Sequence, residues 1–193
     1  MRKNQKQKGS FIMKKLGIVG SLLAGAAVLT SGVQAGEISV GEKIIGLEIA
    51  ASTIQADTFG PLGELDHDGS DVEYGLRLGA QNDEWRTLLT VNYFDSSDDD
   101  QEYVKGLVSF DYLLMKESAF KPFIGVNLGY ISYTTSVPNG DDDDSGFLYG
   151  VQAGFLYRVA EHVQMDVSYR YSFSEADRVN HTEGVVFGVN YIF

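Results

Sequence analysis

The last ten residues of the chain, Gly184-Val-Val-Phe-Gly-Val-Asn-Tyr-Ile-Phe193, alternate between two kinds of side chain. One set of alternate positions is apolar or aromatic, whereas Gly184, Gly188 and Asn190 occupy the other set. Successive side chains of a β-strand point to opposite faces, so a period of two predicts a strand with one apolar face. The end of the chain is therefore expected to be a strand with an apolar face of five residues: Val185, Phe187, Val189, Tyr191 and Phe193.

The same alternation recurs upstream and divides residues 36–193 into eight runs. The seven others cover residues 42–55, 71–81, 85–94, 102–114, 120–133, 146–158 and 163–173. Their apolar faces are nearly uninterrupted, as contact with lipid requires, because a Lys or Arg at the bilayer midplane costs roughly 2–4 kcal/mol. A soluble β-sandwich also alternates, but its apolar face is the interior. The pattern therefore favours a membrane-spanning barrel.

The connections between the runs support the barrel. Long connections (56–70, 95–101, 134–145, 174–183) take turns with short ones (82–84, 115–119, 159–162). Transmembrane barrels join their strands by short turns on the periplasmic side and by longer loops outside. The sequence thus predicts an all-β fold, an eight-stranded antiparallel up-and-down transmembrane β-barrel over residues 36–193, with both termini in the periplasm.

Aromatic residues on the apolar faces are expected to form two belts at the membrane interfaces. One belt lies near the periplasmic rim and holds Trp85, Tyr112, Phe120, Tyr157, Tyr191 and Phe193. The other lies near the outer rim and holds Tyr74, Tyr93, Tyr130, Tyr149 and Tyr171.

Residues 1–35 have the composition of a cleaved signal peptide. Lys14 and Lys15 precede a short apolar stretch, 16–29, and the segment ends in Val-Gln-Ala35. A basic start, a short apolar middle and small residues before the cut are the marks of such a peptide. We expect Gly36 to begin the mature protein, and Met13 is a candidate for the true start.

The mature chain would carry nine Lys and Arg against 27 Asp and Glu, a net charge of −18. This argues against nucleic acid as a partner, because phosphates attract basic side chains. There is no cysteine, so disulfides and thiolate metal sites are excluded.

The terminal strand 184–193, with its C-terminal Phe193, resembles the last strand of bacterial outer-membrane barrels. With the signal peptide and the eight runs, the whole mature chain resembles the OmpA-like transmembrane barrel and opacity-protein group. The resemblance implies a location in the bacterial outer membrane and recognition of the terminal strand by the barrel-assembly machinery. It implies no single activity.

Charged residues on the polar faces are expected to point into the barrel. They are Glu48, Glu73, Asp111 and Asp166 together with Arg77, Arg86, Lys105, Lys121, Arg158 and Arg170. Eight strands leave an interior just wide enough for side chains to fill. These groups would then form a plug of ion pairs; the alternative is a narrow ion path.

Four of the polar faces also carry glycines four residues apart. The pairs are Gly75/Gly79, Gly125/Gly129, Gly150/Gly154 and Gly184/Gly188. They indicate sharply coiled strands, or lumen volume for water or a small ligand.

The long connections hold 15 acidic residues and one base, Arg178. The acidic positions are 57, 64, 66, 68, 95, 98–100, 141–144, 175, 177 and 183. Such charge runs are usually solvated, although weak divalent cation binding stays open. Glu64, Asp66, Asp68 and Gly69 match the start of a calcium loop, but Gly75 stands where its bidentate Glu is needed, so an EF-hand is rejected.

An enzyme is not expected, because nucleophilic chemistry needs a base beside the nucleophile. His162 falls in a predicted periplasmic turn, His181 in a predicted loop, and His67 in a long connection. Ser172-Phe-Ser174 lacks the histidine of the lipid A deacylase pattern. We therefore expect no catalytic, cofactor or metal site.

The sequence predicts a monomeric, non-enzymatic outer-membrane barrel surrounded by lipid and lipopolysaccharide. Its role would be envelope integrity or surface interaction through the acidic loops. The alternative function is a narrow porin-like channel for ions or small solutes.

Overall fold

The computed structural model describes the backbone of residues 41–60, 63–96, 101–115, 118–137, 140–176 and 179–193. Side chains are described for residues 41–53, 72–94, 103–115, 118–132, 145–176 and 180–193. All of these belong to one compact unit, Ser39–Phe193. The predicted signal peptide lies outside the described residues and stays a prediction.

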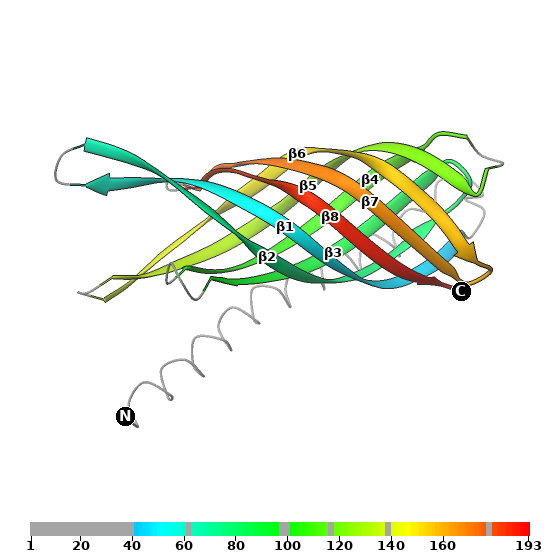
Figure 1. The fold of residues 1–193 in the computed structure, drawn as a ribbon, viewed down its shortest axis with the longest axis horizontal. Helices are drawn as coiled ribbons and strands as arrows, with labels where there is room; N and C mark the ends of the chain where they lie inside the picture. The colour runs from blue at the N-terminus through cyan, green and yellow to red at the C-terminus, as the bar shows by residue number, and fades with distance from the viewer. Residues whose placement is uncertain (1–40, 61–62, 97–100, 116–117, 138–139, 177–178) are drawn as a thin grey trace, which may run out of the picture. The chain divides into compact units, whose positions relative to one another are not determined.

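The described residues form eight strands that close into one antiparallel barrel in chain order, which confirms the predicted fold (Figure 1). The strands are β1 (Glu42–Gly60), β2 (Gly63–Gln81), β3 (Trp85–Ser96), β4 (Gln101–Leu113), β5 (Phe120–Val137), β6 (Gly140–Ala160), β7 (Val163–Ser174) and β8 (Val179–Ile192). Closure pairs β1 with β8 from Ile44↔Ile192 onward. Next to that pair, Lys43 and Phe193 exchange two backbone hydrogen bonds of 2.8 and 3.0 Å.

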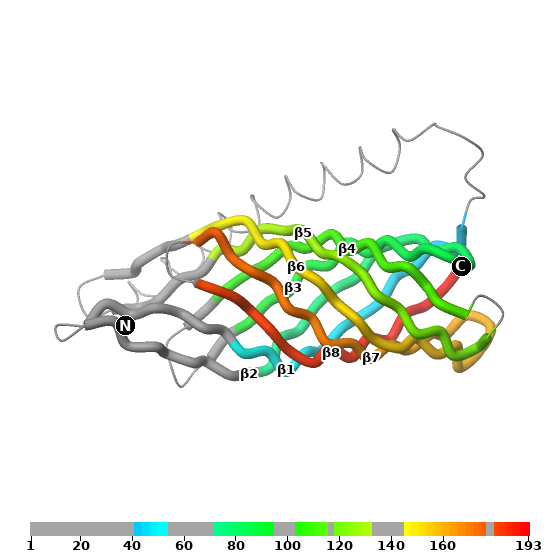
Figure 2. The backbone as a smooth tube through the Cα atoms, turned by 90° about the horizontal axis from the view of Figure 1, so that it is seen from above, coloured from blue at the N-terminus to red at the C-terminus, as the bar shows by residue number. Residues whose placement is uncertain are grey.

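The start of β1 and the end of β8 lie at the same end of the barrel, which we call the turn end (Figures 1 and 2). The short connections after Gln81, Leu113 and Ala160 lie there too. The opposite end, where β1 meets β2 and β5 meets β6, is called the hairpin end. None of the residues that the structure describes form a helix long and apolar enough to cross a membrane.

Two of the predicted long connections, 56–70 and 134–145, are wrong as loops, because their described residues continue the strands. Residues 97–100 of the predicted connection 95–101 lie outside the described residues, so that prediction is not tested there. β1 and β2 stay paired up to Gly60↔Gly63, and β5 and β6 up to Val137↔Gly140. The backbone ladder needs no burial of side chains, so the two strands of a hairpin pair with each other beyond the closed part of the barrel. In these two hairpins, the residues that were predicted as loop lengthen the strands instead. His181 and Glu183, expected in a loop, lie in β8.

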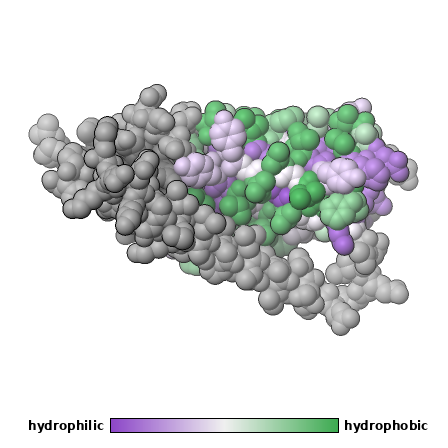
Figure 3. All heavy atoms as spheres, turned by 90° about the horizontal axis from the view of Figure 1, so that it is seen from below, coloured by the Kyte–Doolittle hydropathy of each residue, from purple (hydrophilic) through white to green (hydrophobic). Residues whose placement is uncertain are grey.

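Alternate side chains face outward along every strand, as predicted. Leu47, Leu76 and Val151 are exposed by 61%, 64% and 58%, and Figure 3 shows apolar side chains along the visible wall. The aromatic residues predicted at the periplasmic rim stand outward near the turn end, where they make ring contacts such as Trp85–Tyr112 at 4.9 Å. The wall is thus an apolar surface with aromatic residues near the ends of its strands.

Candidate functional site: the barrel lumen

The lumen holds four buried carboxylates and four buried cations among the residues whose side chains are described. They are Glu48, Glu73, Asp111 and Asp166, and Arg77, Arg86, Lys105 and Arg170. Each is at most 4% exposed. An unpaired buried ion costs several kcal/mol, and the equal numbers of opposite charges allow every one of these ions to be paired.

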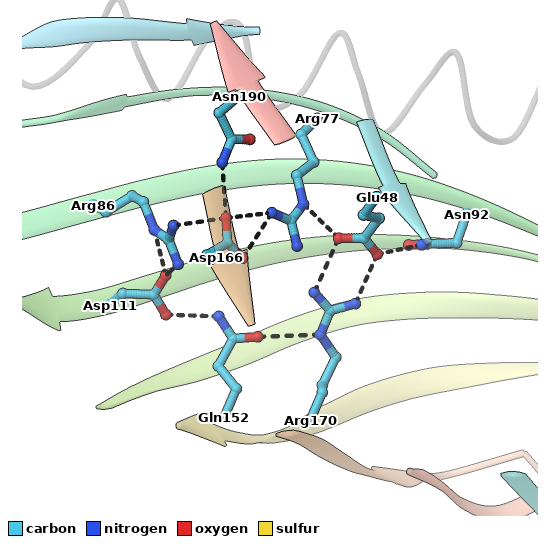
Figure 4. A network of polar contacts seen from close by, with 9 residues as sticks. All are labelled: Glu48, Arg77, Arg86, Asn92, Asp111, Gln152, Asp166, Arg170 and Asn190. Carbon is cyan, nitrogen blue, oxygen red and sulfur yellow. Dashed lines mark hydrogen bonds and ion pairs between the residues drawn. The ribbon is translucent and has the colours of Figure 1, made fainter. Parts of the chain in front are cut away.

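Arg77 of β2 lies at the centre of the network and joins two carboxylates (Figure 4). Its Nε donates to Glu48 Oε2 at 2.5 Å, and its Nη1 donates to both oxygens of Asp166 at 2.8 and 2.9 Å. The amide groups of Asn92 and Asn190 donate to Glu48 and Asp166 respectively. Charge-assisted bonds of this kind are the stronger ones in proteins, so Arg77 ties β1, β2 and β7 together through the lumen.

A second row of contacts runs from Arg86 to Arg170. Arg86 donates to Asp111 through Nε at 2.9 Å, and Asp111 accepts from Gln152 at 2.6 Å. Gln152 Oε1 in turn accepts from Arg170 Nε at 3.1 Å, and Arg170 donates to Glu48 at 3.1 and 3.3 Å. Because Arg86 also reaches Asp166 at 3.3 Å, the contacts close into a ring that crosses the lumen (Figure 4).

Glu73 forms a separate group nearer the hairpin end. Its Oε2 pairs with Lys105 Nζ at 2.8 Å and accepts from the hydroxyls of Tyr103 at 2.6 Å and Ser52 at 3.1 Å. A cavity of about 10 Å³ adjoins Lys105 and Ser52. That volume holds about one water molecule, so it offers no path for a solute.

Two of the predicted lumen charges lie elsewhere. Arg158 pairs with Glu42 at the turn end, and its side chain is 35% exposed. Lys121 lies 3.7 Å from the exposed carboxylate of Asp83 at the same end. Both residues occupy polar-face positions, but they lie close to the end of a strand, where the polar face meets the rim. The remaining eight predicted lumen charges are confirmed as buried.

Two apolar clusters lie on either side of the network, and neither was expected from the sequence. Near the hairpin end the cluster consists of Phe94, Tyr103, Leu107, Ile131, Leu148 and Ala176. Near the turn end it consists of Leu113, Phe123 and Leu156. Except for Ala176, which falls in a predicted long connection, these residues stand at polar-face positions of the predicted runs. Large apolar side chains at polar-face positions were therefore the available indication. One cluster thus lies on each side of the ion pairs along the barrel.

The inward glycines accommodate the long charged side chains. A Cβ at Gly188 would lie 2.7 Å from Cζ of Arg77, and one at Gly75 would lie 2.6 Å from Cγ of Glu48. Such approaches are shorter than real Cβ contacts allow. The volume left by these two glycines is therefore filled by the network and does not serve as a ligand cavity.

The wall separates the serine and histidine considered for catalysis. Ser172 is buried in the lumen and donates to Asn127 at 2.8 Å. His181, in the outward phase of β8, stacks on Tyr171 with ring centroids 4.9 Å apart. His162 lies in the β6–β7 turn, with Nδ1 3.0 Å from the carbonyl oxygen of Ile192. The described residues contain no group of three His, Cys, Asp or Glu that could hold a metal ion.

Comparison with known proteins places this geometry among outer-membrane barrels. The family profile described as outer membrane protein beta-barrel domain matches residues 21–193. The crystal structure of Neisserial surface protein A has a TM-score of 0.63 at 18% identity, covering 78% of this chain and 97% of that one. The solution structure of OprH from P. aeruginosa has a TM-score of 0.58 at 21% identity, covering 79% of this chain and 99% of that one. The crystal structure of the N-terminal barrel domain of Pseudomonas aeruginosa OprF has a TM-score of 0.52 at 14% identity, covering 76% of this chain and 97% of that one. No curated protein sequence matches. At these identities the structures share the fold.

Proposed function

The chain belongs to the outer membrane protein β-barrel domain family, and from this premise we propose that it is a closed, non-enzymatic barrel that supports the envelope and presents its acidic hairpin end to the cell surface. The membership confirms the resemblance drawn from the terminal strand and the location in the bacterial outer membrane. The orientation, the closed lumen and the surface role belong to the proposal.

The observation that carries the proposal is the filling of the lumen. The charge-matched network crosses its middle, and one buried apolar cluster lies toward each end. An ion entering this lumen would have to break several buried pairs at once, and each broken buried pair costs about 3–5 kcal/mol. This supports the plug over the competing hypothesis of a narrow channel.

Conductance across planar bilayers tests the closed lumen. We expect the purified, refolded protein to add no steady unitary currents, and the Phe94→Ala/Leu107→Ala variant to stay silent because the ion pairs remain. Steady currents that change size when Arg77 or Arg170 is replaced would instead establish a channel lined by those residues.

The surface role is supported by where the acidic residues stand in the chain. Asp98–Asp100 lie between β3 and β4, and Asp141–Asp144 lie in β6 at the hairpin end. Anionic lipopolysaccharide would repel these carboxylates unless divalent cations bridge the two. We include weak divalent cations and lipopolysaccharide as partners in the proposal.

Uptake of a hydrophobic fluorescent dye by intact cells tests this role. Cells lacking the protein should take up more dye, and wild-type protein should restore the barrier. Replacing Asp98–Asp100 and Asp141–Asp144 by Asn should abolish the restoration, whereas Asp83→Asn/Glu161→Gln at the turn end is the matched control and should restore it fully. Equal protection by both variants would refute the role of the acidic hairpin end.

The absence of enzymatic activity is the remaining part of the proposal. It is supported by the opposite faces of Ser172 and His181, since a general base must lie within hydrogen-bond reach of its nucleophile. Lipid A mass spectra from cells with and without the protein should be identical. An acyl change that disappears with His181→Ala would show that the barrel is an enzyme.

A further inference from the structure

Among the described side chains that face outward from the strands, only one carries a carboxylate. It belongs to Glu183, which is half-buried and stands in the outward phase of β8 together with Val185 and Phe187. The outer wall of a membrane barrel is otherwise apolar, and an ionised carboxylate without a partner is disfavoured in such surroundings. Glu183 therefore requires a cationic partner on the wall.

His181 shares this face of β8 with Glu183. Side chains two residues apart on a strand point to the same side, and their Cα atoms are roughly 7 Å apart. The cross-strand partner of His181 is Phe173, yet its ring stacks on Tyr171 with centroids 4.9 Å apart. Tyr171 is the cross-strand partner of Glu183. The stack therefore holds the imidazole beside the row of residues that contains the carboxylate.

The carboxylate of Glu183 is held by a second aromatic residue of β7. The hydroxyl of Tyr169 donates to Glu183 Oε2 at 2.6 Å. An ionised carboxylate has two oxygens with about four acceptor positions, so this bond leaves it able to coordinate a cation. Carboxylates that bind metal ions are commonly oriented by such a supporting hydrogen bond.

We propose that His181 and Glu183 bind one Zn²⁺ ion on the outer wall, with water in the remaining coordination positions. Imidazole suits zinc, copper and nickel, whereas sites made only of carboxylates and water suit magnesium and calcium. The site therefore differs in metal class from the divalent cations proposed for the acidic hairpin end. Two protein ligands are fewer than the three of a catalytic zinc site, so the ion should exchange with solvent. The competing arrangement is a direct ion pair of imidazolium and carboxylate without a metal.

Calorimetric titration of zinc chloride into the refolded barrel in detergent tests the site. Excess magnesium chloride should be present to occupy the sites made only of carboxylates. We expect one saturable zinc site in wild type, and Tyr169→Phe, which removes only the supporting hydroxyl, should weaken it by about 10–100-fold. His181→Ala and Glu183→Gln should weaken it at least as much. His162→Ala is the matched control and should bind zinc as wild type does.

Glu183→Gln keeps the shape of its side chain, so it tests the site even if loss of the ring stack in His181→Ala prevents folding. Equal zinc affinity in wild type and Glu183→Gln would overturn the proposal and leave the direct ion pair. Displacement of zinc by magnesium, or loss of the site in His162→Ala, would also overturn it.

Electron paramagnetic resonance of the barrel loaded with Cu²⁺ provides a second readout. The chain contains three histidines, so the coupling of copper to an imidazole nitrogen can be assigned by single substitutions. The coupling should disappear in His181→Ala and persist in His162→Ala, and its survival in His181→Ala would contradict the site. None of these outcomes affects the conductance and dye-uptake tests of the proposed function, because neither test depends on this part of the wall.

Discussion

At the scale of single residues, Arg77 joins carboxylates from two different strands across the lumen. Its guanidinium binds Glu48 on β1 and Asp166 on β7, and each of these carboxylates also accepts bonds from a second arginine. Removing Arg77 would therefore leave both buried carboxylates under-compensated. The exposed pair Arg158–Glu42 uses the same functional groups, but solvent can replace either partner.

Replacing Arg77 by Met should lower the free energy of unfolding by about 3–5 kcal/mol, because it breaks a buried pair and leaves charge behind. Arg158→Met, the matched control at the turn end, should cost at most about 1 kcal/mol. Urea unfolding in lipid vesicles, followed by Trp85 fluorescence, measures the free energy of unfolding of both variants. Similar small losses for the two variants would mean that the ion pairs contribute little to stability.

Gly188 offers an independent test of how tightly the network fills the lumen. A Cβ there would lie 2.7 Å from Arg77 Cζ and 2.8 Å from Asp166 Oδ2, so Gly188→Ala should cost about 1–3 kcal/mol, as overpacking does. In an Arg77→Ala background the same change should cost clearly less, because the guanidinium is gone and only the contact with Asp166 Oδ2 remains. A double-mutant cycle of unfolding free energies measures the coupling, and additive costs would contradict the packing argument.

At the scale of the strands, sequence periodicity predicts the wall better than the interior. A period of two identifies outward faces such as Leu76 and Leu78, because lipid contact requires apolar side chains there without interruption. It does not predict which inward residues meet, since Arg77 and Asp166 are 89 residues apart and are brought together only by closure of the barrel. Phe94 and Leu148 were missed because single apolar residues at polar-face positions do not show which other inward residues they pack against.

The strand ends were mispredicted for a different reason. Polar residues such as Thr134 and Asp143 suggested a loop, yet they are cross-strand partners in the β5–β6 hairpin. Backbone hydrogen bonds hold such a ribbon whatever its side chains are, so composition alone placed the strand ends too early. The acidic character of these segments was recognised correctly, and only their conformation was not.

The extended hairpins should be dispensable for the barrel itself. Replacing Thr135–Asp142 by Asn-Gly joins Thr134 to Asp143 through a two-residue turn, and should change the unfolding free energy by no more than about 0.5 kcal/mol, as surface changes do. Deleting the single residue Gln152 is the contrasting variant: it shifts every following side chain of β6 to the other face, and we expect no folded barrel. Heat-modifiable gel mobility and urea unfolding report both. A barrel destabilised by the hairpin deletion would show that the extension contributes to its core.

At the scale of the whole molecule, the barrel divides into parts with different environments. The wall is apolar and meets lipid, the described part of the lumen holds equal numbers of buried carboxylates and cations, and an apolar cluster lies on each side of them. Among the side chains that the structure describes, the four buried carboxylates of the lumen meet four buried cations, so these groups do not account for the acidic excess of the sequence. The proposed surface role requires that the hairpin end, with its acidic residues, faces the outside of the cell.

The orientation can be tested because the chain contains no cysteine. A single cysteine at Asn139→Cys, between β5 and β6, should react with a membrane-impermeant maleimide on intact cells. The matched variant Glu161→Cys, at the exposed β6–β7 turn, should react only after the outer membrane is opened. The start of β1 and the end of β8 lie at the turn end. The expected labelling would therefore also locate Lys43 and Phe193 in the periplasm. Labelling of Glu161→Cys alone on intact cells would show the reverse orientation, with the acidic hairpins in the periplasm.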